Sequence, residues 1–253
     1  EIAECKTPKV SVIIPVYNEF AFTYQCLASI VNAGDHAGME VILADDHSTD
    51  LTRQICSVVS HVKVVRSERN LGFLRNCNQA AQQASGEYLF FLNNDTQVQK
   101  GWLDTQLRLM EENPLIGMTG AKLVYADGRL QEAGGIIWQD GSAWNYGNGQ
   151  DAGAPEYNYV KDVDYLSGAA IMIRAALWKQ IGGFDERFAP AYCEDSDLAF
   201  AVRKAGYRVV YQPQSVVVHY EGISNGTDVR TGIKKYQVAN TNKLYQKWKQ
   251  DIQ

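Results

Sequence analysis

The chain has 253 residues, of which 45% are hydrophobic and 21% are charged, an ordinary globular composition that suits one large domain or two closely packed halves. No apolar run is long enough to span a bilayer, and we expect no secretory leader. The net charge of -5 argues against a surface that coats nucleic acid. Because the chain begins with Glu1 rather than Met, we expect it to be processed, trimmed, or one domain of a larger protein.

The cysteine pattern indicates a reducing environment. The five cysteines are odd in number, none lies in a close pair, and no metal-ligand spacing is present. We therefore interpret them as reduced, mostly buried thiols of a cytosolic protein. Cys193 stands out because it adjoins the most acidic segment of the chain.

The first half of the chain alternates apolar strands with helices. Ser48, Thr49 and Asp50 form a helix start signal after the second strand. This alternation predicts an α/β fold with a mainly parallel, Rossmann-like sheet that is flanked by helices. The expected strands cover residues 10–17, 41–46, 62–66 and 88–92, and the expected helices cover 20–32, 48–59 and 73–84.

The second half has a different character and predicts a smaller antiparallel portion. Asp127 and Gly128 lie between two apolar runs, as in a hairpin turn. Residues 138–160 form a long aromatic loop region, in which Trp138, Trp144 and Tyr146 are candidates for choosing the ligand. Further expected elements are a strand at 165–174, a helix at 194–205 with Gly206 as its C-terminal cap, and a strand at 216–219.

Four of the expected strands end in polar residues. These residues are Tyr17 with Asn18, Asp45 with Asp46, Asn93 to Asp95, and His219. In an open α/β sheet, ligands bind beyond the carboxyl ends of the strands. We therefore expect these side chains to converge on one crevice.

The two adjacent carboxylates Asp45 and Asp46 suggest two different roles. One can cap the following helix and favour its dipole. The other is free to accept a hydrogen bond from a base N–H or a ribose hydroxyl, which we favour over a purely structural role.

Asp95 and His219 suggest a cation site, because a hard divalent cation that bridges phosphates needs one or two protein ligands. An Asx turn at Asp95 and a structural His219 are the alternatives. No glycine-rich phosphate loop follows the first strand. A cation would therefore carry much of the phosphate charge, with Arg69, Arg75 and Lys122 as the candidate basic residues.

Glu194, Asp195 and Asp197 crowd three carboxylates into the start of a helix. Acids at a helix N-terminus are favoured by the dipole alone, so a structural role is a strong alternative. Crowded like charges also raise a pKa, which is one way to make a general base.

In combination, these segments resemble the inverting family 2 glycosyltransferases with the GT-A fold. The resemblance spans about residues 9–225, and the segment 219–226 is similar to the bacterial branch that builds O-antigen and capsule polysaccharides, many of them rhamnosyltransferase-like. The segments that carry it are 12–19, 45–50, 70–72, 93–95, 182–185 and 194–198.

The resemblance implies a role for each candidate residue. Residues 1–125 would form the nucleotide-sugar-binding half, and residues 126–253 the acceptor-binding and catalytic-base half of the same GT-A domain. Asp195 would be the catalytic base, with Glu194 beside it toward the acceptor. On the donor side, Pro15 and Tyr17 would flank the nucleobase, and Asp46 would accept a hydrogen bond from its imide N–H. Asn70, Gly72 and Arg75 would lie near the nucleoside or the diphosphate. Asn94 and Asp95 would fall on the metal motif.

The metal motif departs from the family pattern, because its first position is Asn93 rather than Asp. Asp95 and His219 would then hold Mn²⁺ or Mg²⁺. A binding module without catalysis is the main alternative, and Asn93 is its best support. A nucleotidyltransferase is a weaker alternative, since the phosphate loop rich in glycine and lysine is absent.

The implied activity is inverting transfer of a hexosyl or deoxyhexosyl group in cell-surface polysaccharide synthesis. The donor would be a nucleotide-diphosphate sugar, and the acceptor a glycan or a lipid-linked saccharide. We expect no nucleic-acid partner, and a cytoplasmic location that includes peripheral contact with the inner face of the cell membrane.

Overall fold

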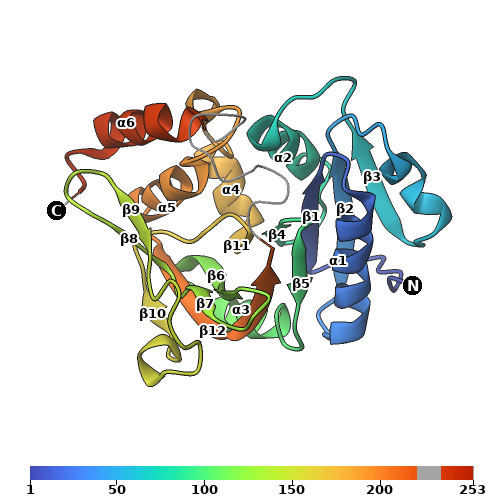
Figure 1. Ribbon diagram of the computed structural model, residues 1–253, viewed down its shortest axis with the longest axis horizontal. Helices are drawn as coiled ribbons and strands as arrows, with labels where there is room; N and C mark the ends of the chain where they lie inside the picture. Colours follow the sequence, from blue (N-terminus) through green and yellow to red (C-terminus); the bar gives the residue numbers. More distant parts are fainter. Residues whose placement is uncertain (221–234, 253) are drawn as a thin grey trace.

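The computed structural model describes residues 1–220 and 235–252 as a mixed α/β fold (Figure 1). Most strands belong to one ten-stranded sheet, and a separate two-stranded sheet joins β8 and β9. The helices are α1 (Phe20–Ala33), α2 (Phe73–Ala81), α3 (Asp104–Glu112), α4 (Ala175–Ile181), α5 (Glu194–Lys204) and α6 (Tyr236–Trp248), with 3-10 helices η1 (Leu51–Ser57), η2 (Pro155–Tyr157) and η3 (Glu186–Phe188). The strands are β1 (Val10–Val16), β2 (Met39–Asp45), β3 (Val62–Arg66), β4 (Tyr88–Leu92), β5 (Thr96–Val98), β6 (Ile116–Val124), β7 (Leu130–Glu132), β8 (Gly135–Ile137), β9 (Ala143–Asn145), β10 (Lys161–Asp162), β11 (Ala170–Arg174) and β12 (Arg208–His219).

The first four strands form the parallel part of the sheet, as predicted. Strand β1 lies between β2 and β4 and is parallel to both, and β3 extends the sheet beyond β2. Their carboxyl ends therefore lie along one edge of the sheet. This arrangement brings the segments after β1, β2 and β4 together.

The sheet continues without a break into the second half of the chain. Strand β11 runs antiparallel to both β4 and β6, and β12 runs parallel to β6. Strands β5, β7 and β10 add antiparallel partners along β12 and β6. The expected antiparallel portion is therefore present, while the proposed division at residue 125 stays a prediction.

Two hydrophobic cores cover the two faces of the sheet. In β1, Ile13 belongs to one core, whereas Val12 and Ile14 belong to the other, as the two-residue period of a strand requires. The first core packs under α2, α4, α5 and α6, and the second under α1 and α3. Burial on both faces explains why these strands are almost continuously apolar.

Three elements differ clearly from the sequence-based prediction, apart from shifts of a few residues at other ends, and local hydrogen bonds account for two of them. The predicted helix at 48–59 is the shorter η1, because the amides of Thr49 and Asp50 bond to the side chain of Asn18 instead of entering the helix. The predicted strand at 165–174 begins only at Ala170, because the amides of Ser167 and Gly168 bond to side chains. The last strand is much longer than predicted.

Helix α6 is fastened to the segment that leads into α5. The Nζ of Lys247 contacts Asp185 at 2.8 Å and Asp197 at 2.7 Å. The side-chain amide of Asn240 donates to the carbonyl oxygens of Phe188 and Ala191. The C-terminal helix α6 thus holds the start of α5 and the segment before it in place.

Within the described part of the chain, no helix is both long and apolar enough to cross a membrane. All five cysteines are free thiols, of which Cys26 and Cys77 are buried and Cys56 is exposed.

Candidate active site

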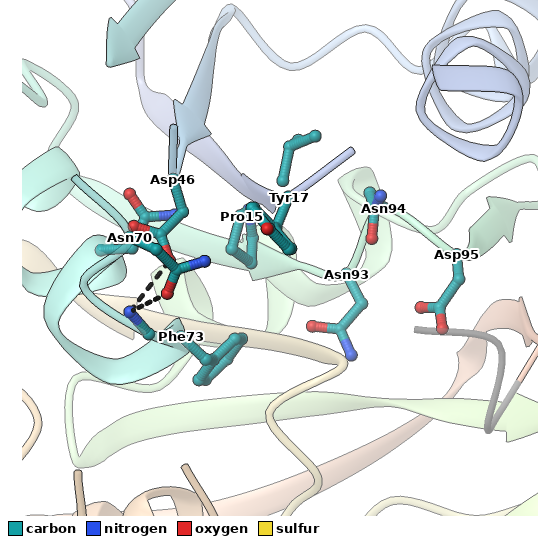
Figure 2. Close-up of a pocket in the computed structure, with 11 residues that line it drawn as sticks. Pro15, Tyr17, Asp46, Asn70, Phe73, Asn93, Asn94 and Asp95 are labelled. Carbon is teal, nitrogen blue, oxygen red and sulfur yellow. Dashed lines mark hydrogen bonds between the residues drawn. The ribbon is translucent and has the colours of Figure 1, made fainter. Parts of the chain in front are cut away.

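A cavity of about 250 Å³ opens beyond the carboxyl ends of β1, β2 and β4. Figure 2 shows Asp46 and Asn70 at one end and Asp95 at the other, with Pro15 and Tyr17 between them. The cavity is lined by Pro15, Val16, Tyr17, Asp46, Asn70, Gly72, Phe73, Asn76, Asn93, Asn94 and Asp95. Polar residues after three separate strands therefore converge on one crevice, as the sequence predicts, whereas Asn18, Asp45 and His219 are not part of its lining.

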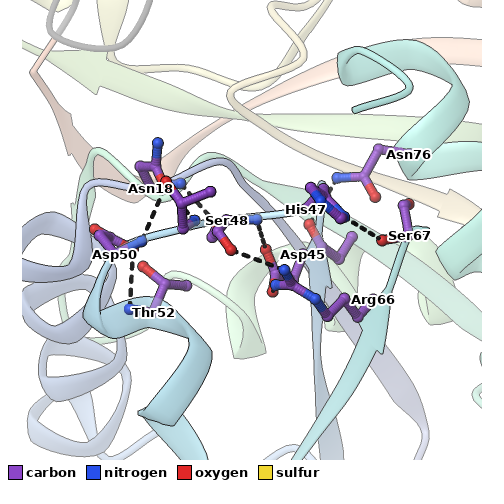
Figure 3. Close-up of polar contacts among 11 residues, drawn as sticks. Asn18, Asp45, His47, Ser48, Asp50, Thr52, Arg66, Ser67 and Asn76 are labelled. Carbon is purple, nitrogen blue, oxygen red and sulfur yellow. Dashed lines mark hydrogen bonds and ion pairs between the residues drawn. The ribbon is translucent and has the colours of Figure 1, made fainter. Parts of the chain in front are cut away.

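Asp45 and Asp46 take different roles, and Asp45 is structural. Its side chain accepts from the amide of Ser48 at 2.8 Å and pairs with Arg66, which also donates to the Ser48 carbonyl oxygen (Figure 3). The amide of Asn18 donates to the Ser48 hydroxyl at 2.7 Å, which ties this turn to the end of β1. The turn after β2 is thus rigid.

Asp46 faces the cavity. Its carboxylate accepts from the amides of Leu71 at 2.6 Å and Gly72 at 2.9 Å, so it fixes the 70–72 loop. Burial raises the pKa of Asp46, and these two amide bonds oppose that rise. Each carboxylate oxygen has a second lone pair, so the group can still accept from a ligand N–H.

Gly72 connects the cavity to the second half of the chain. Its φ is +81°, and a Cβ there would lie 2.8 Å from the Cβ of Pro190. The Pro190 carbonyl oxygen accepts from the amide of Leu74 at 3.1 Å. The loop that leads into the acidic helix therefore rests directly on the 70–72 loop, which leaves room only for glycine.

Tyr17 lies at the mouth of the cavity with 53% of its surface exposed. An aromatic ring held there by the end of β1 offers a flat face to a planar ligand group. Pro15 lies beside it in the lining.

Asp95 and His219 meet, although they follow different strands. The distance from His219 Nε2 to Asp95 Oδ1 is 3.4 Å, and the two side chains are only 12% and 8% exposed. Strand pairing sets this distance, because His219 of β12 pairs with Thr96 of β5, and the amide of Tyr220 donates to the Asp95 carbonyl oxygen. The two side chains thus lie together, while their role as cation ligands stays a prediction.

The donor set of this pair fits a divalent cation. One carboxylate and one imidazole suit Mn²⁺, which accepts nitrogen as well as oxygen ligands. Beside them, the buried Oδ1 of Asn93 has no hydrogen-bond partner, whereas Asn94 donates to Thr23 at 3.1 Å. Among residues 1–220 and 235–252, no three or more His, Cys, Asp or Glu side chains cluster as metal ligands, so phosphates and water would complete the shell.

The acidic pair opens α5, as predicted. Asp195 accepts from the amides of Gly168 at 3.0 Å and Ser196 at 2.7 Å. Burial raises the pKa of Asp195, and the hydrogen bonds from these amides counter the rise. Burial, and then the charge of Asp195, raise the pKa of Glu194 to about 8. At neutral pH, Glu194 therefore holds a proton, which lessens the like-charge repulsion beside Asp195.

Cys77 of α2 is buried within electrostatic range of both Glu194 and Asp46. Burial raises the pKa of its thiol well above the usual range, and the charges of Glu194 and Asp46 raise it further. Both carboxylates are therefore close enough to act on this one thiol.

Two of the candidate basic residues lie elsewhere. Arg75 does not line the cavity and pairs at 2.6 Å with Glu186 on the surface. Lys122 is buried and donates to the Ala152 carbonyl oxygen and the Asn158 side chain. Neither side chain therefore reaches the cavity beyond the ends of β1, β2 and β4.

Sequence reasoning missed several residues at the site. Phe73 and Asn76 line the cavity from the start of α2. Gln131 contacts His219, and Glu132 accepts from the amide of Ser167. Strand β7 is too short for its own pattern to reveal these contacts, although two adjacent polar residues after a hairpin turn are a weak signal.

Part of the resemblance could not be placed. Residues 221–226 of the segment 219–226 lie outside the described residues.

The chain is similar to a known protein family and to bacterial proteins of polysaccharide synthesis. Residues 11–180 match the family model described as "Glycosyl transferase family 2". The O-antigen biosynthesis protein RfbC of Myxococcus xanthus is 29% identical over 231 residues, which are 88% of this chain and 18% of that protein. The N-acetylglucosaminyl-diphospho-decaprenol L-rhamnosyltransferase of Mycobacterium tuberculosis is 27% identical over 249 residues, with 88% of this chain and 79% of that protein covered.

A solved structure shares the fold. GalNAc-T7, crystallised with UDP, GalNAc and Mn²⁺, superposes with a TM-score of 0.77 at 17% identity, over 96% of this chain and 49% of that one.

Proposed function

Because the chain belongs to glycosyl transferase family 2 and has a fold of the GT-A type, we propose that it transfers a sugar with inversion from a nucleotide-diphosphate sugar. The acceptor is a hydroxyl group of a glycan or of a lipid-linked saccharide. The proposed setting is the synthesis of cell-surface polysaccharide such as O-antigen or capsule, at the cytoplasmic face of the membrane. The names of the Myxococcus and mycobacterial relatives support this setting.

One observation carries the proposal: the cavity at the strand ends has Asp46 and Asn70 in its lining at one end and Asp95 at the other, and Asp95 is 3.4 Å from His219. In this arrangement, Tyr17 and Pro15 flank the base, and Asp46, Asn70 and Gly72 hold the nucleoside. The diphosphate extends toward Asn94 and Asp95.

Asp195 acts as the general base. Its carboxylate takes the proton from the acceptor hydroxyl while that oxygen attacks the anomeric carbon. The bond from this carbon to the diphosphate oxygen breaks on the opposite face, which inverts the stereochemistry. Glu194 remains protonated beside Asp195 and can donate a hydrogen bond toward the acceptor.

Asp95 and His219 hold the divalent cation. When bound, Mn²⁺ or Mg²⁺ stabilises the charge that grows on the leaving diphosphate. Asn93 adds an amide oxygen but no charge, so the pair carries little negative charge of its own.

The β8–β9 hairpin is the proposed region of acceptor choice. Trp138 and Trp144 lie edge to face with ring centroids 5.4 Å apart, and both are exposed. The Asp164 carboxylate accepts from the amide of Ile137, just before the segment that contacts Asp195. An exposed aromatic surface of this kind suits a sugar ring.

The release of nucleoside diphosphate from a panel of donor sugars, with Mn²⁺ and an acceptor mixture, tests the proposal. An acceptor-dependent release supports transfer. A protein that binds these donors without releasing the diphosphate would instead be a binding module, the alternative that Asn93 favours.

A further inference from the structure

His219 lies in a chain of three side chains that starts at Gln131. The Nδ1 of His219 is 3.0 Å from the Oε1 of Gln131, and its Nε2 is 3.4 Å from Asp95 Oδ1. Gln131 is only 2% exposed. The imidazole is thus held on both sides in a nearly dry environment.

The partner at Nδ1 determines which nitrogen is available. An amide oxygen can only accept a hydrogen bond, so Nδ1 must carry the hydrogen. In the neutral ring, Nε2 then presents its lone pair toward the Asp95 carboxylate. Two acceptors that face each other at this distance call for a proton or a cation between them, and a divalent cation satisfies both.

The backbone of Gln131 is held in place by parts of the chain that contain neither Asp95 nor His219. It belongs to β7, which pairs with β6, and its carbonyl oxygen accepts from the Asn148 side chain at 3.1 Å. Asn148 also donates to the hydroxyl of Tyr125 at 2.9 Å. The backbone of Gln131 is therefore anchored independently of the ligands that its side chain faces.

We propose that Gln131 is a positioning residue, whose Oε1 accepts the Nδ1 hydrogen of His219 and so directs Nε2 at a divalent cation beside Asp95. This inference rests on the cation of the proposed function. Metal-ligating histidines generally donate their other ring N–H to such a partner, and the loss of that partner weakens metal affinity about 10- to 100-fold.

Two substitutions separate positioning from packing. Gln131→Met keeps the length of the side chain but removes the strong acceptor, and Gln131→Glu keeps an acceptor oxygen. Gln106→Met is the matched control, because Gln106 is also buried and hydrogen-bonded, to Thr119 and Ser215, away from the cation pair.

The first readout is Mn²⁺ affinity, measured by electron paramagnetic resonance with and without UDP. We expect Gln131→Met to bind Mn²⁺ about 10- to 100-fold more weakly, while Gln131→Glu and Gln106→Met stay near the wild type. Equal affinity in wild type and Gln131→Met would overturn the inference and leave the cation proposal intact. A wild type that binds no Mn²⁺ in either condition would overturn both.

The second readout is the tautomer of His219 in the metal-free protein, from long-range ¹H–¹⁵N spectra at mildly alkaline pH. His47 and His61 face the carbonyl oxygens of Ser67 and Ile2 through Nδ1, so they serve as internal references. We expect His219 to share their Nδ1–H form in the wild type and to lose it in Gln131→Met. An Nε2–H form in the wild type would overturn the inference.

Discussion

Glu132 and Asp195 accept hydrogen bonds from adjacent backbone amides, those of Ser167 at 2.9 Å and Gly168 at 3.0 Å. The two carboxylates lie on separate elements, β7 and α5, and hold one short segment between them. The orientation of the proposed base therefore depends on a strand that is distant in sequence. This contact also explains why residues 165–169 leave the expected strand.

The substitution Asp195→Asn should nearly abolish transfer and leave donor binding close to normal. Loss of a general base typically lowers the rate by about 10²–10⁴-fold. Steady-state release of nucleoside diphosphate measures the rate, and calorimetry measures donor binding. Asp127→Asn, at an exposed turn, is the control. Wild-type turnover in Asp195→Asn would show that another residue is the base, with Glu194 as the next candidate.

The raised pKa of Glu194 predicts that stability falls as pH rises. The folded state holds the Glu194 proton up to about pH 8, whereas the unfolded chain releases it near 4.5, the ordinary pKa of a glutamate. The stabilisation is therefore fully present below the unfolded pKa and is lost as the pH rises through the folded pKa. The slope between these values is at most about 1.4 kcal/mol per pH unit.

Denaturant unfolding across this pH range checks the prediction. Glu194→Gln cannot titrate, so its free energy of unfolding should fall less steeply than that of the wild type. Parallel curves for the two proteins would show that Glu194 is not the group responsible.

The substitution Asp46→Ala should weaken nucleotide binding about 10- to 100-fold, because it removes charged hydrogen bonds that fix the 70–72 loop. Asp45→Ala provides the contrast: it should lower stability by about 1–3 kcal/mol through the loss of the Ser48 and Arg66 contacts. Calorimetry with nucleoside diphosphates and thermal unfolding measure the two effects. Unchanged affinity in a folded Asp46→Ala variant would leave Asp46 as a loop support only.

Activity should require a divalent cation, with Mn²⁺ at least as effective as Mg²⁺. Asp95→Ala should remove the metal-dependent activity, and His219→Ala should weaken it, because the imidazole contributes no negative charge. Cation binding should be weak without nucleotide and stronger with it. Full activity after treatment with a chelator would contradict this prediction, and the charge of the leaving group would then need another partner.

The alternation of strands and helices made the parallel half of the sheet predictable. The apolar runs that end at Val16, Asp45 and Leu92 show which edge carries the ligand, because parallel strands end on the same side. The meeting of Asp95 with His219 follows from the same rule. Their positions at strand ends were visible, although the pairing of β5 with β12 was not.

Contacts made by irregular segments could not be predicted. The proximity of Pro190 to Gly72 depends on how the two halves pack, and nothing in the local sequence of residues 185–193 encodes it. Arg75 shows the opposite error: a basic residue near a phosphate site can be directed outward to a surface carboxylate such as Glu186. The direction of a side chain such as that of Arg75 can be determined only from the tertiary structure.

The position of strand β7 limits how the length of the turn before it can be changed. Its consecutive residues Gln131 and Glu132 point to opposite faces, one toward His219 and the other toward Ser167. Inserting or deleting one residue in the turn at 125–129 would exchange the two directions along the strand. Variants in which this turn is longer or shorter by one residue should therefore lose cation binding and base orientation together, while a substitution at an exposed turn position such as Asp127 should leave both intact.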